Sequence, residues 1–304
     1  MKKLLLCTLL FPLVLASCKK DDHEPAFIFP EGKVPEKIIE LTGEEGLLPS
    51  RITRTESSSN SVATTITTLI LEYGYDDRNR IVSIDERKEV KRILAEDQSE
   101  KINVMETGRD VLTYHDRGYL LNRVSWYNGF LVETVYYAYE GDAVFRKTTA
   151  EKTTYVSRIT LDEAGRALAC THADLSPDRY YAKYQYDGDG NVIYHEDVIG
   201  GNSGTWLTIG YDDKKGIFSS VNTPQWYMAT QTDFIFGDAF GNSCFPFLQN
   251  NKREQEDRFR PEYKYSLAFE YNEQGYPVLF YHPEPGYYHG DETYTVEYVP
   301  AKVF

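Results

Sequence analysis

Apolar and polar residues alternate along most of the chain after about residue 50. In these stretches an apolar or aromatic residue recurs at every second position. Examples are the runs Leu69, Leu71, Tyr73, Tyr75; Val135, Tyr137, Tyr139; Leu207, Ile209, Tyr211; Leu267, Phe269, Tyr271; and Tyr294, Val296, Tyr298. A period of two places alternate side chains on the same face of a β-strand. Tyrosine, which favours strands, provides 25 of the 304 residues. The pattern therefore predicts an all-β protein.

A short motif separates these alternating stretches. It begins with an aromatic or apolar residue, which is usually followed by Asp or Asn. Two polar residues, then Gly or Asn, and then a new apolar run complete it. Its copies lie at 75–79, 114–118, 161–165, 186–190, 211–216 and 271–275, with a shorter variant at 139–142. Asp or Asn at the start of a turn bonds its own backbone two residues on, and Gly or Asn accepts a positive φ. We therefore predict turn-forming roles for Asp76, Asn79, Gly118, Asp162, Gly165, Asp187, Gly190, Asp212, Gly216, Asn272 and Gly275.

Hairpins repeated in this way predict an antiparallel up-and-down meander of roughly 14 strands, curled as a single sheet or barrel-like. The sequence leaves open whether the sheet closes. Residues 222–263 break the period and carry several aromatic residues, so we expect an insertion that packs on the sheet as a cap. We expect one β-meander domain at 49–304, preceded by a charged, proline-containing tether at 18–48.

The N-terminus has the organisation of an export signal. Lys2 and Lys3 precede an apolar run that is too short to span a bilayer. The run ends in Leu15-Ala16-Ser17-Cys18, which resembles the box cut by the lipoprotein signal peptidase. This resemblance implies a signal peptide at 1–17 and acylation of Cys18, which would anchor the protein to a lipid bilayer. The charged residues that follow resemble a surface-export signal of gut-dwelling Gram-negative bacteria. We expect an outer-membrane lipoprotein on the cell surface, or otherwise on the periplasmic face.

The repeats resemble the Tyr-Asp (YD) hairpin units of RHS-type shell proteins, best at 186–191. A closer likeness is to a family of gut-bacterial surface lipoproteins of unknown function that have a porin-like antiparallel β fold. The matching pieces are the lipoprotein box and residues 211–216, 250–251, 270–277 and 294–298. This resemblance implies a fold and a cellular address, but it carries no activity to this chain.

Searches for reactive or cofactor-binding motifs give no candidate. The net charge of −14 disfavours nucleic acid as a partner. Residues 187–191 resemble the start of a calcium loop, but Val192 and Val198 occupy the positions that need Gly and Glu, so we interpret the segment as a turn. His282 and His289 lie near three carboxylates in a segment that we interpret as a solvated hairpin tip. We expect no catalytic residue, no metal and no cofactor.

Two kinds of residue keep alternative interpretations. Cys170 and Cys244 form either a disulfide or two buried thiols. Trp126, Trp206 and Trp226 are candidates for stacking on a ligand, although packing in the core is the commoner role for each.

The leading hypothesis is a non-enzymatic surface module that binds a glycan or a cell-envelope protein. One alternative is a carbohydrate hydrolase with two carboxylates in a groove, and another is a structural component of the envelope. The carboxylates that line the main concavity discriminate between the first two, because a glycosidase needs a facing pair.

Overall fold

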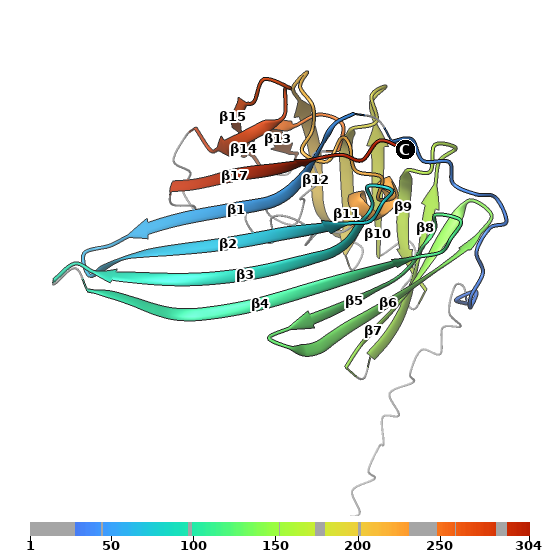
Figure 1. Cartoon of the computed structure of the whole chain (residues 1–304), viewed down its shortest axis with the longest axis horizontal. Coiled ribbons are helices and arrows are strands. Elements are labelled where there is room, and N and C mark those ends of the chain that lie inside the picture. Colours follow the sequence, from blue (N-terminus) through green and yellow to red (C-terminus); the bar gives the residue numbers. More distant parts are fainter. Residues whose placement is uncertain are drawn as a thin grey trace, which may run out of the picture.

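The computed structural model of the chain describes residues 28–43, 45–96, 99–151, 153–173, 180–199, 202–230, 248–258, 260–283 and 291–304. These residues form 17 strands and one short helix (Figure 1). The first nine strands are β1 (Leu47–Ser59), β2 (Ala63–Tyr75), β3 (Ile81–Leu94), β4 (Glu100–Tyr114), β5 (Leu120–Tyr127), β6 (Phe130–Glu140), β7 (Ala143–Ala150), β8 (Thr153–Leu161) and β9 (Ala167–His172). They are followed by β10 (Tyr180–Tyr186), β11 (Val192–Ile199), β12 (Asn202–Tyr211), α1 (Gln225–Thr230), β13 (Lys252–Asp257), β14 (Arg260–Ser266), β15 (Ala268–Tyr271), β16 (Pro277–Tyr281) and β17 (Asp291–Pro300).

The strands form one antiparallel meander that closes on itself. Each strand from β1 to β14 pairs with the next, and β15 to β17 continue in the same way. Only Leu267 separates β14 from β15, and its N–H donates to the carbonyl of Arg253 at 2.7 Å. β1 pairs with both β2 and β17, so the first and last strands lie side by side (Figure 1). The prediction of an antiparallel, barrel-like meander is confirmed, with 17 strands in place of roughly 14.

One end of this barrel carries the turns of the repeated motif, and we call it the turn rim. The turn at 162–166 is representative. Asp162 donates its N–H to the carbonyl of Arg166 at 2.9 Å, and its Oδ1 accepts the N–H groups of Ala164 and Arg166 at 3.0 and 2.8 Å. Gly165 has a φ of +78°, a value that side chains disfavour. The first and fifth residues are therefore held together by two hydrogen bonds.

The other predicted turns have closely similar geometry. Asp76, Asp187 and Asn272 make the same set of backbone contacts at the first position, and His115 uses its Nδ1 instead of a carboxylate. The fourth positions with positive φ are Asn79, Gly118, Gly190 and Gly275. Each turn is followed by a register shift of one residue, as a turn with a bulge requires.

The segment at 211–216 was predicted to be a turn of this kind, and that prediction is wrong. Gly216 has no positive φ, and the strand paired with β12 is β13. Asp212 instead exchanges two hydrogen bonds of 3.1 Å with the backbone of Asn251, the same pair that Asp162 makes with Arg166. Residues 213–250 are thus an insertion inside one turn, between its first and fifth positions. The predicted insertion at 222–263 was placed too late, because β13 and β14 belong to the sheet.

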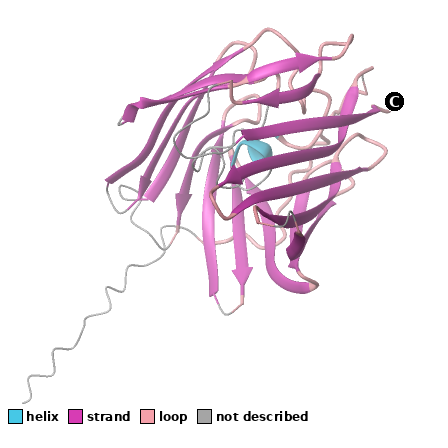
Figure 2. Cartoon of the chain, turned by 90° about the vertical axis from the view of Figure 1, so that its left-hand side faces the viewer, coloured by secondary structure: helices cyan, strands magenta, loops and turns pink. Residues whose placement is uncertain are grey.

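The described part of this insertion lies inside the barrel. We call residues 216–230 the plug; they include α1, which the strands surround in Figure 2. Phe218 packs edge-on against Tyr73 of β2 at 5.6 Å between ring centroids, and Trp226 packs against Tyr137 of β6 at 5.3 Å. Contacts with strands this far apart in the sheet require an interior position. The plug and the inward-facing side chains form one buried core.

Tyrosines of the motif tie the turn rim together. Their hydroxyls donate to backbone carbonyls of the preceding strand at 2.8 to 3.0 Å; the pairs are Tyr75–Pro49, Tyr114–Ile81, Tyr139–Leu120, Tyr186–Ala167, Tyr211–Val192 and Tyr298–Pro277. Five of these acceptors directly follow the fifth residue of a turn. Tyr114, Tyr139, Tyr186 and Tyr211 therefore bridge their own turns to the preceding ones, and Tyr298 joins β17 to the turn before β16. Each hydrogen bond contributes about 1 kcal/mol.

The described part of the predicted tether contacts the barrel. Residues 28–43, 45 and 46 lie along the outside of the turn rim, where the N–H of Tyr139 donates to the carbonyl of Lys33 at 2.9 Å. Ile39 donates to the carbonyl of Arg117 at the same distance. Phe29 is buried against Ala138 and other residues of β6 and β7. β1 begins two residues before the predicted domain boundary of 49.

Asp212→Ala should destabilise the protein by about 1–3 kcal/mol, because the buried N–H of Asn251 loses its acceptor. Urea unfolding followed by circular dichroism measures the change. The matched control is Asp213→Ala, whose side chain is 87% exposed and whose effect should stay within about 0.5 kcal/mol. Equal effects of the two substitutions would contradict the split turn.

The rim tyrosines predict a loss of stability in alkali. Burial raises the pKa of Tyr75, Tyr139 and Tyr211 above the ordinary value, and it raises the pKa of Tyr137 in the core to about 12. The folded state therefore favours the neutral phenol. This contribution is complete below the unfolded pKa of about 10 and is lost as the pH rises toward the folded values.

Phenolate absorbance and circular dichroism, recorded together from pH 8 upward, measure this loss. We expect most tyrosines to ionise only as the strands unfold, whereas in urea all should titrate near pH 10. Full ionisation near that pH with the fold intact would contradict the assignment of the rim tyrosines.

Candidate functional site: an aromatic depression on the outer wall

An open depression of about 520 Å³ lies on the outer wall of β3, β4 and β5. It is lined by Asp85, Thr107, Gly108, Arg109, Val111, Trp126 and Gly129. Register explains why its polar and aromatic groups meet. Arg109 of β4 lies opposite Asp85 of β3 on one side and opposite Trp126 of β5 on the other. Residues opposite one another in antiparallel strands point to the same face.

The turn between β5 and β6 fixes the position of Trp126. Asn128 and Gly129 both have positive φ, at 49° and 80°, as a two-residue hairpin turn requires. The N–H of Asn128 donates to the carbonyl of Thr107 at 2.7 Å, and the side chain of Asn128 accepts the N–H of Thr107 at 2.9 Å. These bonds attach the hairpin tip to β4 and keep the indole beside Arg109.

The charges of the depression are exposed and paired only loosely. Arg109 Nε lies 3.5 Å from Asp85 Oδ1, and about half of each side chain is accessible to solvent. An exposed pair of this kind contributes little stability. Its donors and acceptors can therefore exchange water for the hydroxyls of a ligand at low cost. An indole beside a guanidinium and a carboxylate provides one stacking surface and two polar groups.

A strongly apolar surface adjoins this depression. Tyr127, Phe130, Leu131, Val132 and Tyr136 of the β5–β6 hairpin are exposed by 42, 76, 61, 40 and 47% respectively. We call these five residues the tip patch; by register Leu131 lies opposite Trp126 on the outer face of the hairpin, whereas Tyr127 and Phe130 lie opposite one another on its inner face. The register shifts between Ser125 and Trp126, where Glu133 and Leu131 are the partners, so Val132 is an extra residue in β6. This bulge lets Leu131 and Val132 both reach solvent.

The other predicted site residues lie elsewhere. Trp226 is 3% exposed inside the barrel, so it packs in the core and presents no surface to a ligand. The side chain of Trp206 lies outside the described residues, as do Cys18 and the signal peptide. Cys170 is half-buried on β9, and burial raises the pKa of its thiol. Cys244 lies outside the described residues, so the disulfide stays a prediction.

The segment that contains His282 and His289 was interpreted as a solvated hairpin tip, but Glu292 within it is not solvated. This carboxylate is buried on the inner face of β17, where it pairs with Arg54 and accepts the hydroxyl of Tyr294 at 2.8 Å. His282 Nε2 lies 3.8 Å from it. His289 and Glu284 lie outside the described residues. Within the part of the chain that the structure describes, no three His, Cys, Asp or Glu side chains gather as metal ligands would.

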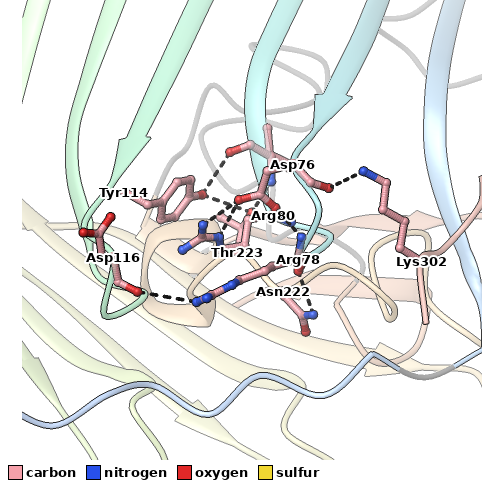
Figure 3. A network of polar contacts seen from close by, with 9 residues as sticks. Asp76, Arg78, Arg80, Tyr114, Asp116, Asn222, Thr223 and Lys302 are labelled. Carbon is pink, nitrogen blue, oxygen red and sulfur yellow. Dashed lines mark hydrogen bonds and ion pairs between the residues drawn. The ribbon is translucent and has the colours of Figure 1, made fainter. Parts of the chain in front are cut away.

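A second polar cluster, shown in Figure 3, attaches the plug to the turn rim. The hydroxyl of Thr223 accepts the N–H of Ile81 at 2.9 Å, and Asn222 Nδ2 donates to the carbonyl of Arg78 at 3.0 Å. Asp76 is occupied by an ion pair with Arg80 at 2.6 Å and by its own turn. This cluster holds the plug in place and offers no accessible carboxylate pair.

Comparisons with known proteins show a likeness to solved structures. No family model and no curated protein matches the chain. Among solved structures, the crystal structure of a porin-like protein from Bacteroides uniformis ATCC 8492 aligns with 83% of this chain and 96% of that chain, with 12% identity and a TM-score of 0.38. At that identity and score the likeness carries no argument about what this chain does. In the described residues, no helix is long and apolar enough to cross a membrane.

Proposed function

We propose that the protein is a membrane-anchored, non-enzymatic binding module that takes a glycan in the depression around Trp126. One observation carries the proposal: a partly buried tryptophan lies on an outer wall in register with Arg109 and Asp85. Sugar rings present apolar C–H faces that stack on indole, and their hydroxyls bond to guanidinium and carboxylate groups. A volume of about 520 Å³ accommodates a short oligosaccharide.

The lining of the depression favours binding over hydrolysis. A retaining glycosidase needs two carboxyl groups about 5–5.5 Å apart, and an inverting enzyme needs them about 6.5–9.5 Å apart. Among the residues that line the depression, Asp85 is the single carboxylate, and it already faces Arg109. The lining therefore lacks the second carboxyl group that the hydrolase alternative requires.

In this proposal Cys18 is the residue that anchors the protein to the membrane. Its acylation would hold the barrel at the outer membrane, on the cell surface or otherwise on the periplasmic face, as the lipoprotein box suggests. A cell-envelope protein is the second candidate ligand, because the exposed apolar tip patch adjoins the depression. A purely structural role in the envelope would need no such depression.

A glycan array probed with the chain from Lys19 onward tests the proposal. We expect binding to a restricted set of glycans, and we expect Trp126→Ala to weaken it at least about tenfold, because one stacking contact contributes about 1–1.5 kcal/mol beyond its buried area. Leu168→Ala, at an exposed outer position on β9, should leave binding unchanged.

Binding that survives Trp126→Ala in full would remove the depression as the site. If the array gives no hits, while the tip patch binds an envelope protein, the second candidate would replace the first.

A further inference from the structure

The tip patch is an unusual surface for a chain with a net charge of −14. Its five apolar or aromatic residues fall within one hairpin, whereas exposed apolar residues on soluble proteins are normally scattered. Two of the five are tyrosines, and Trp126 precedes the patch directly. Aromatic side chains with a polar atom are enriched where a protein meets the boundary between lipid and water.

The N-terminal end of the described chain lies on the same wall as this patch. Phe29 packs against Ala138 of β6 and Phe145 of β7, both on the outer face. The patch occupies the other half of β6, from Phe130 to Tyr136. Seven residues separate Ala138 from Leu131, which corresponds to about 23 Å along a strand.

The predicted acylation site is within reach of the patch. Cys18 precedes Ile28 by ten residues, and ten extended residues span at most about 35 Å. The acyl chains can therefore enter a bilayer that also touches the β5–β6 hairpin.

We propose that the tip patch inserts into the interface of the bilayer that holds the acyl anchor, and that it fixes the orientation of the barrel on the membrane. This inference rests on the anchoring of Cys18 in the proposed function. A lipid tether alone lets the barrel rotate, whereas a second contact of apolar and aromatic side chains selects one orientation. The depression around Trp126 then lies at the membrane surface, beside the glycans of the envelope.

A second copy of the chain is a weaker occupant for this surface. A stable interface covers about 800 Å² on each partner and some 20–30 residues. The tip patch offers five. A bilayer needs no matching surface, since it accepts any apolar group that reaches it.

The experiment uses the full acylated protein in phosphatidylcholine vesicles, with or without bromine on the acyl chains. Bromine quenches indole fluorescence at short range, so Phe130→Trp places a reporter in the tip patch, and its emission is isolated by comparison with the wild type. We expect brominated lipid to remove about half of this added emission, because an indole at this boundary contacts the acyl chains. The double variant Leu131→Ser/Val132→Ser in the same background should lose this quenching.

The matched control is Val62→Ser, an equally exposed apolar residue in the turn between β1 and β2, which should keep the quenching. Circular dichroism checks that each variant is folded. Flotation with vesicles separates the two proposals. Wild-type protein that does not float contradicts the anchoring itself, whereas Phe130→Trp protein that floats without quenching of the added indole contradicts the membrane contact alone.

Two further results would overturn the contact. One is quenching in the double variant equal to that of Phe130→Trp alone. The other is a dimer of the detergent-solubilised protein in sedimentation velocity that dissociates in the double variant, because it would assign the patch to a second copy.

Discussion

The hydrogen-bond pair between the first and fifth residues of each turn is the constraint on which the barrel depends. Asp162 shows it within five residues, and Asp212 shows it across an insertion. The pair fixes where a strand reverses and inserts the bulge that follows. A one-residue error in register would exchange the inner and outer faces of a strand. Tyr114, Tyr139, Tyr186 and Tyr211 then join their own turns to the preceding ones through backbone carbonyls.

The insertion in the turn between Asp212 and Asn251 follows from the width of the barrel. Barrels with many strands enclose more space than their own side chains fill. The plug occupies that space with Phe218, Trp226 and Tyr227, which are almost fully buried against inward-facing tyrosines. Because both stems of the insertion are joined by Asp212 and Asn251, the sheet continues as though the turn were intact. The buried side chains of the interior therefore stabilise the fold, and the outer wall presents the groups that can bind a ligand.

Sequence periodicity predicted the class and the meander because each turn carries its own chemistry. It undercounted the strands because it assigned two strands to each of the seven motif copies, whereas β1, β14 and β17 lie outside these pairs. The turn-forming role of Gly216 was predicted wrongly, because a local pattern cannot show that the fifth residue of this turn is Asn251, 39 residues after Asp212. Of the residues in the depression, only Trp126 was a candidate from the sequence. Asp85 and Arg109 become its neighbours only through the register of β3 to β5. Isolated charges in strands carry no signal of that kind.

Amide hydrogen exchange of the full chain, resolved by mass spectrometry, tests the turn constraint most directly. If the first and fifth positions are bonded in the split turn, the N–H of Asn251 should exchange as slowly as that of Arg166, although one partner is 39 residues away and the other only four. Exchange of Asn251 at the rate of an unstructured chain, with Arg166 still protected, would contradict the account.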